Sequence, residues 1–102
     1  MHLIQIVLPL TDNRGTRFAP SAFDKLQKEL AGTFGGVAAY VRAPAIGIWK
    51  EGAKGFDKEE VVVFEVLAEH LDKQWWSEYR QALEARFDQK EIFVCAIPAE
   101  RL

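Results

Sequence analysis

The sequence predicts an α+β fold, in which a four-stranded antiparallel sheet carries two helices on one of its faces. Four short segments have the β-branched and aromatic composition of strands. Two longer segments carry apolar residues at helical spacing, and the order along the chain is strand, helix, strand, strand, helix, strand. The length of 102 residues is near the commonest domain size, so we expect a single domain over residues 1–102.

The first strand and the first helix are separated by a turn rich in Asp, Asn and Gly. The strand is the compact apolar run of residues 3–8. The helix is expected to begin at Pro20 or Ser21, where Ser21 followed by Asp24 resembles a capping box. Its apolar stripe consists of Phe23, Leu26, Leu30 and Phe34. Gly35 is placed to end the helix, because glycine tolerates the left-handed backbone of a C-cap.

The middle of the chain predicts two strands joined by a hairpin loop. Residues 37–50 have an extended pattern, which is interrupted at Ala43-Pro44 because proline cannot donate to a sheet ladder. Residues 51–59 contain two glycines and several charges and are expected to form the loop. Residues 61–67, with valine and phenylalanine in succession, form the clearest strand of the chain.

The second helix is expected to begin after Asp72, whose side chain can cap it. Its apolar stripe consists of Trp75, Trp76, Tyr79, Leu83 and Phe87. Adjacent residues on a helix point about 100° apart, so one tryptophan should lie in the core. The other should lie at the edge of the stripe, against residues 43–49 or a partner chain. Residues 92–97 form the last strand, which Pro98 ends.

This βαββαβ order is that of the ferredoxin-like fold. Right-handed crossovers place both helices on the same face of the sheet, so the opposite, open face meets water, a partner or a ligand. Strand alternation gives that face Leu3, Gln5, Val7, Tyr40, Arg42, Val61, Val63, Glu65, Leu67, Phe93, Cys95 and Ile97. Because this surface is too apolar to be left wet, we expect a homodimer that covers it.

Four stretches of the sequence resemble small bacterial proteins of the ferredoxin-like, dimeric α+β barrel type, which have no assigned function. These are Leu8-Pro9-Leu10-Thr11-Asp12-Asn13, Phe34-Gly35-Gly36, Arg42-Ala43-Pro44-Ala45 and Trp75-Trp76-Ser77-Glu78-Tyr79-Arg80. The resemblance covers nearly the whole chain. It also implies a relation to better-studied dimeric barrels, which include small monooxygenases acting on aromatic substrates or haem.

The ligand-binding candidates are the polar and aromatic residues expected near the open face: Tyr40, Arg42, Trp49, Glu65 and Cys95. Arg42 and Glu65 fall on adjacent predicted strands and could pair, or Arg42 could hold a carboxylate or phosphate. A structural ion pair is the more common role of such residues. Gln5 could add a hydrogen bond to a ligand, and Cys95 is more often an inert buried thiol than a nucleophile.

Composition excludes several classes of function. The net charge of −2 and the scattered cations disfavour a nucleic-acid partner. No apolar run is long enough to span a membrane, no leader peptide is evident, and a single cysteine fits a reducing compartment, so we expect a cytoplasmic protein. No metal-ligand spacing is present, and we expect no built-in cofactor. His70 is a lone loop histidine, which is more often an ordinary surface residue than an acid or base.

Whether the chain is an enzyme stays open from these observations. The first hypothesis is a homodimeric domain with a pocket for an anionic or aromatic small molecule on the open face, anchored by Arg42. One alternative is a self-association or interaction module whose open face is used up in the dimer. The other is a monooxygenase-like enzyme that works without a cofactor.

Overall fold

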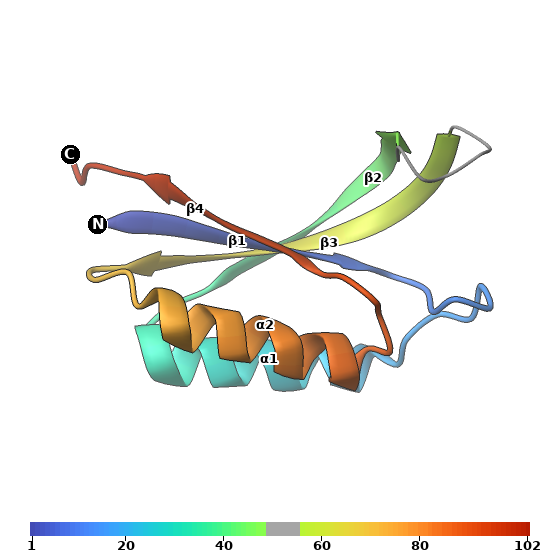
Figure 1. The fold of residues 1–102 in the computed structure, drawn as a ribbon, viewed down its shortest axis with the longest axis horizontal. Coiled ribbons are helices and arrows are strands. Elements are labelled where there is room, and N and C mark those ends of the chain that lie inside the picture. Colours follow the sequence, from blue (N-terminus) through green and yellow to red (C-terminus); the bar gives the residue numbers. More distant parts are fainter. Residues whose placement is uncertain (49–55) are drawn as a thin grey trace.

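The computed structural model describes the backbone of residues 1–48 and 56–102, and the side chains of residues 1–39 and 61–102. Strands β1 (His2–Pro9), β2 (Ala38–Ile48), β3 (Phe56–Ala68) and β4 (Phe93–Pro98) form one antiparallel sheet in the order β2-β3-β1-β4. Helices α1 (Pro20–Phe34) and α2 (Lys73–Arg86) lie side by side under one face of it (Figure 1). The α+β class, the four antiparallel strands and the two helices are therefore confirmed.

The core lies between the helices and the sheet, and β1 shows why. Its burial alternates strictly, with Ile4, Ile6 and Leu8 buried and the residues between them half-buried. Successive strand side chains point to opposite faces, so one set meets the helices. The same core holds Phe64 of β3, Leu26 and Leu30 of α1, and Trp76 and Leu83 of α2.

The open face carries the apolar residues expected of it. Leu67, Phe93 and Ile97 are 45%, 62% and 42% exposed. Val63 is an exception, since it is only 2% exposed although the alternation places it on this face. It lies on an inner strand, between Val7 of β1 and position 40 of β2, so neighbours flank it on both sides.

The long hairpin of β2 and β3 differs from the sequence prediction at its tip. Residues 56–59 were expected in a loop but belong to β3, and the ladder continues to the pair Ile48 and Phe56. The two strands rise away from the helix layer (Figure 1), and their antiparallel backbone pairing continues there. The interruption expected at Ala43-Pro44 is present as a register shift between Arg42 and Ala45 within a continuous β2.

Local signals set three of the helix ends, and one prediction is wrong. The N-cap of α1 is Ala19, and no side chain caps it, so the capping box at Ser21 does not form. Pro20 occupies the first turn, where its fixed φ suits a helix and its missing N–H costs nothing. Gly35 ends α1 in the left-handed region at φ 82°, as expected. Asp72 caps α2 by accepting from the Trp75 backbone N–H at 3.0 Å.

The two tryptophans divide as the helical geometry requires. Trp76 is 7% exposed and stacks on Phe34 with ring centroids 5.2 Å apart. Trp75 is half-buried at the edge, stacked on Tyr79 at 4.9 Å and edge-on to Phe34 at 5.6 Å. Among the residues whose side chains are described, the rings that contact Trp75 come from α1 and α2.

A polar cluster also joins the helices. The Glu29 carboxylate of α1 accepts from both Arg86 terminal nitrogens, at 2.9 and 3.1 Å, and from the Tyr79 hydroxyl at 3.2 Å. Burial raises the pKa of Glu29, but the hydrogen bonds and positive charge of Arg86 outweigh it and leave the pKa lowered. Burial, followed by the charge and hydrogen bond of Glu29, raises the pKa of Tyr79 to about 12.

We expect Trp76→Ala to lower the free energy of unfolding by about 3–5 kcal/mol, because it empties a large volume in the core. Trp75→Ala should cost clearly less, since that ring is already partly solvated. Urea unfolding of both variants measures this, and equal losses would contradict the division between core and edge.

We expect alkaline pH to destabilise the fold through Tyr79. Its folded pKa of about 12 lies above the ordinary value of about 10, so the unfolded chain loses the proton first. The contribution is therefore fully present below pH 10 and is lost as the pH rises towards about 12. Unfolding midpoints across this window should fall more steeply for the wild type than for Tyr79→Phe, and parallel curves would exclude the effect.

Candidate functional site

A row of three polar side chains crosses the open face at the middle of the sheet. The register places Gln5 of β1 opposite both Glu65 of β3 and Cys95 of β4. The Gln5 side-chain N–H donates to the Glu65 carboxylate at 2.6 Å, and the Cys95 thiol lies 3.7 Å from the Gln5 Oε1 that accepts from it. Gln5 therefore joins two of the residues that the sequence singled out.

The other candidates are placed by the backbone alone or not at all. The register sets Tyr40 opposite Val63 and Arg42 opposite Val61, so both positions share the face of Glu65. Arg42 pairs with Val61, which precedes Glu65 by four residues on β3. At strand spacing this separation is about 13 Å along the sheet. The direct cross-strand neighbours of Glu65 are Ala38 and Gln5. Trp49 lies outside the described residues.

A cavity of about 460 Å³ opens where α1 ends and β2 begins, next to the last residues of β3. We call it the β3-end cavity. Its lining residues are Leu3, Phe34, Gly36, Val37, Ala38, Glu65, Val66, Leu67, Glu69 and Arg101. Its size is within the range of small-molecule sites, and its walls are apolar with a few charged groups, as such sites usually are.

Three charged residues give the β3-end cavity its chemistry. Glu65 is half-buried and already oriented by Gln5, whereas Glu69 and Arg101 are exposed at the rim. Two carboxylates favour a cationic centre in the ligand, and one guanidinium favours a carboxylate or phosphate beside it. The arrangement suits a ligand that carries both signs of charge and an apolar body.

The sequence pointed to Glu65 but not to Glu69, Arg101 or Phe34 as its neighbours. Glu69 follows β3 by one residue, and Arg101 lies in the C-terminal tail. The tail reaches the cavity because the Ala99 N–H donates to the Met1 carbonyl at 3.1 Å, which sets both chain ends beside β3. No sequence signal marks a contact of this kind.

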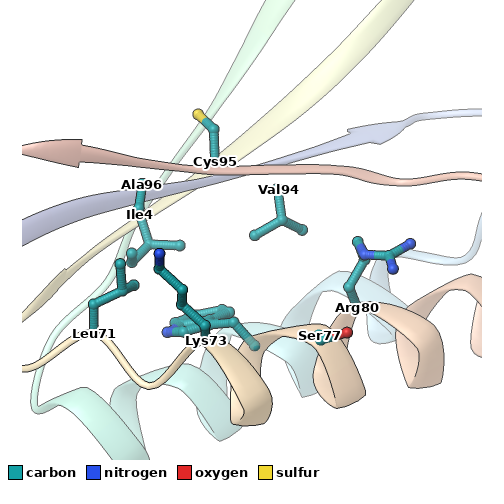
Figure 2. A pocket seen from close by; sticks show the side chains of 9 residues that line it. Ile4, Leu71, Lys73, Ser77, Arg80, Val94, Cys95 and Ala96 are labelled. Atoms are coloured by element: carbon teal, nitrogen blue, oxygen red, sulfur yellow. The ribbon is translucent and has the colours of Figure 1, made fainter.

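A second hollow lies between α2 and β4 (Figure 2). We call it the α2–β4 groove, and it consists of two adjoining cavities of about 240 and 370 Å³ that share Arg80 and Val94. Lys73 and Arg80 rise from α2 towards the strand, while the Cys95 side chain points to the opposite face of the sheet (Figure 2). The rim of this groove carries Lys73, Glu91 and Arg80, and Arg80 is paired with Glu84 at 2.8 Å.

Neither His70 nor a metal-binding cluster adds a candidate site among the described residues. His70 is exposed in the turn before α2. No cluster of three or more His, Cys, Asp or Glu side chains that could hold a metal is found among the described residues. None of the described helices is both long and apolar enough to cross a bilayer.

Comparison with known proteins gives one informative likeness. No family model matches the chain, and no curated protein matches it. Among solved structures, a phage SAM lyase in complex with S-methyl-5′-thioadenosine superposes with a TM-score of 0.60. The likeness covers 99% of this chain and 92% of the lyase at 15% sequence identity, so the two share a small α+β fold.

This likeness overturns the functional prediction made from the sequence. That prediction combined an unassigned binding role with two alternatives, a self-association module and a monooxygenase-like enzyme. The matched protein is an enzyme with a nucleoside thioether in its complex, and 92% of its chain corresponds in fold to this one. Strand alternation predicts which face of the sheet is apolar, but it does not predict a reaction. The sequence therefore led to a different functional prediction.

We expect Gln5→Leu to lower the free energy of unfolding by about 1–3 kcal/mol, because it leaves the half-buried Glu65 carboxylate without its donor. The double variant Gln5→Leu, Glu65→Leu should recover part of that loss, since no polar group is then left unpaired. Urea unfolding of the two single variants and the double variant gives the coupling energy. Strictly additive losses would mean that the hydrogen bond contributes nothing.

Proposed function

We propose that this chain is an enzyme that binds S-adenosylmethionine, or a closely related nucleoside sulfonium, in the β3-end cavity and cleaves it as a lyase. The observation that carries the proposal is the charge pattern of that cavity, with carboxylates and a guanidinium on apolar walls. The fold shared with a SAM lyase supports it.

The ligand and the cavity are complementary in charge. S-adenosylmethionine has a sulfonium and an ammonium cation, one carboxylate and an aromatic base. The carboxylates of Glu65 and Glu69 would face the two cations, and the Arg101 guanidinium would hold one oxygen of the substrate carboxylate, which leaves the other oxygen free. Apolar side chains such as Phe34 and Leu67 would cover the nucleoside.

The same surroundings favour cleavage. When the bond between sulfur and the γ-carbon breaks, sulfur keeps the electron pair and becomes the neutral thioether of S-methyl-5′-thioadenosine. The γ-carbon, which has lost that electron pair, forms a new bond within the substrate. Either an oxygen of the substrate's own carboxylate attacks it and closes a ring, or the neighbouring carbon gives up a proton to Glu65 and a double bond forms. Because positive charge disappears along this path, the apolar walls favour the transition state over the charged substrate.

We also infer that the chain is one ferredoxin-like domain over residues 1–102. The element order βαββαβ, the strand order β2-β3-β1-β4 and the helices on one face support this assignment. A homodimer stays a prediction, supported by the exposed Leu67, Phe93 and Ile97 on the open face. Light scattering after size exclusion measures it.

We expect the purified protein to convert S-adenosylmethionine to S-methyl-5′-thioadenosine, measured by liquid chromatography with mass detection. Glu65→Gln should lower kcat/KM by about tenfold to a hundredfold, because a hydrogen bond or contact to a charged group contributes about 1.5–3 kcal/mol. The four-carbon product identified by NMR distinguishes ring closure from proton loss.

Glu78→Gln is the matched control, because Glu78 is exposed on α2 and its partner is Gln74 of the same helix. This variant should keep full activity. No thioether product from the wild type, or equal activity of Glu65→Gln and Glu78→Gln, would refute the proposal.

A further inference from the structure

The outer edge of β4 is open in the described sheet, where β4 is the last strand and pairs only with β1. The Ala99 N–H donates to the Met1 carbonyl at 3.1 Å, and this pair continues the register of β1 and β4. Hydrogen-bonded and non-hydrogen-bonded pairs alternate along an antiparallel ladder. Residues 93, 95 and 97 therefore bond to β1, whereas the N–H and C=O groups of Val94 and Ala96 point to the open edge.

This edge is short, and both of its ends are defined. At one end Pro98 has no N–H to donate, which suits a residue whose nitrogen faces outward. At the other end the Ile92 N–H already donates to the Glu84 carboxylate at 2.9 Å. The strand sequence FVCAIP contains no charged residue. Soluble proteins usually protect such an edge with charges, because open backbone groups are a template for another strand.

The open-face side chains of β4 are self-complementary about Cys95. Phe93 is 62% exposed and lies two residues before it, and Ile97 is 42% exposed and lies two residues after it. An antiparallel copy of β4 with a two-fold axis at Cys95 sets Phe93 of each copy opposite Ile97 of the other. Both exposed apolar side chains then gain an apolar cross-strand neighbour.

The neighbouring registers match these side chains less well. Moving the axis one residue towards the start of β4 sets Ile97 opposite Glu91 of the copy. Moving it one residue towards the end sets Phe93 opposite Ala99, which lies past the end of the strand. The register centred on Cys95 is therefore favoured.

The charges beside the edge are complementary in the same arrangement. Lys73 of α2 is exposed near the Ala96 end of β4, and Glu91 is exposed just before the start of the strand. Antiparallel pairing brings Lys73 of each copy towards Glu91 of the other. Arg80 lies closer to the axis, but its charge is already compensated by Glu84 at 2.8 Å.

We infer that the edge of β4 is an interface for a second copy of this chain, paired antiparallel about a two-fold axis at Cys95. Val94 of each copy exchanges backbone hydrogen bonds with Ala96 of the other, so the two sheets become continuous. This contact differs from a dimer in which two open faces stack. It uses none of the charged residues of the β3-end cavity, and it is independent of the proposed lyase activity.

Cys95 tests the position of the axis without a substitution, because it is the single cysteine of the chain. Its side chain points to the open face (Figure 2), and a non-hydrogen-bonded pair has Cα atoms about 4.5 Å apart, which a disulfide can span. Oxidation of the full chain with copper phenanthroline should give a linked dimer on a non-reducing gel. Moving the thiol to exposed α1, in Cys95→Ser, Lys28→Cys, should slow linkage about tenfold or more.

Two lysine substitutions distinguish edge pairing from stacked faces. Light scattering after size exclusion should show a wild-type dimer at micromolar concentration. Ile97→Lys should raise the Kd of the dimer about tenfold or more, because it sets a charge opposite the apolar Phe93. Leu67→Lys is the matched control, since Leu67 is 45% exposed on the same face but lies two strands in from the edge. This control should leave the Kd unchanged, and equal weakening by both variants would overturn the inference.

A charge exchange tests the antiparallel direction. Lys73→Glu and Glu91→Lys should each weaken the dimer about threefold or more at low salt, and the double variant should recover the wild-type Kd because the two signs are exchanged. Circular dichroism of each variant checks that it is folded. A monomeric wild type, a dimer that Cys95 does not link, or a double variant weaker than both single variants would overturn the inference.

Discussion

The alternation of β1 between two environments is the constraint on which the rest of the structure depends. β1 is flanked by β3 and β4, and its alternate residues Ile4, Ile6 and Leu8 are almost fully buried under the helices. A shift of one residue in its register would turn this set to the other face, so the register is tightly specified. Once it is set, Gln5 must lie between Glu65 and Cys95 on the open face.

The helices are held on the sheet by apolar packing and on each other by a polar contact. Aromatic rings from α1 and α2 meet at Phe34, Trp75 and Trp76, and the Glu29 carboxylate receives Arg86 and Tyr79 from the other helix. The aromatic rings contact each other in stacked and edge-on arrangements, and the carboxylate accepts donors only from defined positions. Phe34 takes part in the aromatic contacts and also lines the β3-end cavity.

The β3-end cavity and the α2–β4 groove differ in their charged residues and in how they form. The β3-end cavity forms where a helix end, a strand end and the C-terminal tail converge, and it combines carboxylates with Arg101. The α2–β4 groove forms because the sheet ends at β4 while α2 extends beside it with Lys73 and Arg80 on its rim. The described part of this small domain therefore has two hollows with different sets of charged side chains.

The sequence by itself determined the elements and their faces, because these depend on local periodicity and capping. The alternation in β1, the cap at Asp72, the C-cap at Gly35 and the division of Trp75 from Trp76 all follow from short-range geometry. It also identified Glu65 and Cys95, since a polar residue in an apolar strand is visible locally. The length of β3 was missed at residues 56–59, because pairing with β2 outweighs polar composition there.

Only the tertiary structure decided what surrounds those residues. Gln5 links Glu65 and Cys95, which lie 60 and 90 positions away from it in the chain, and Arg101 lines the same cavity as Glu69. Such contacts depend on strand order and on where the chain ends lie, neither of which leaves a periodic trace. The physical reason is that periodicity reports which face a residue takes, whereas a site depends on which distant faces are brought together.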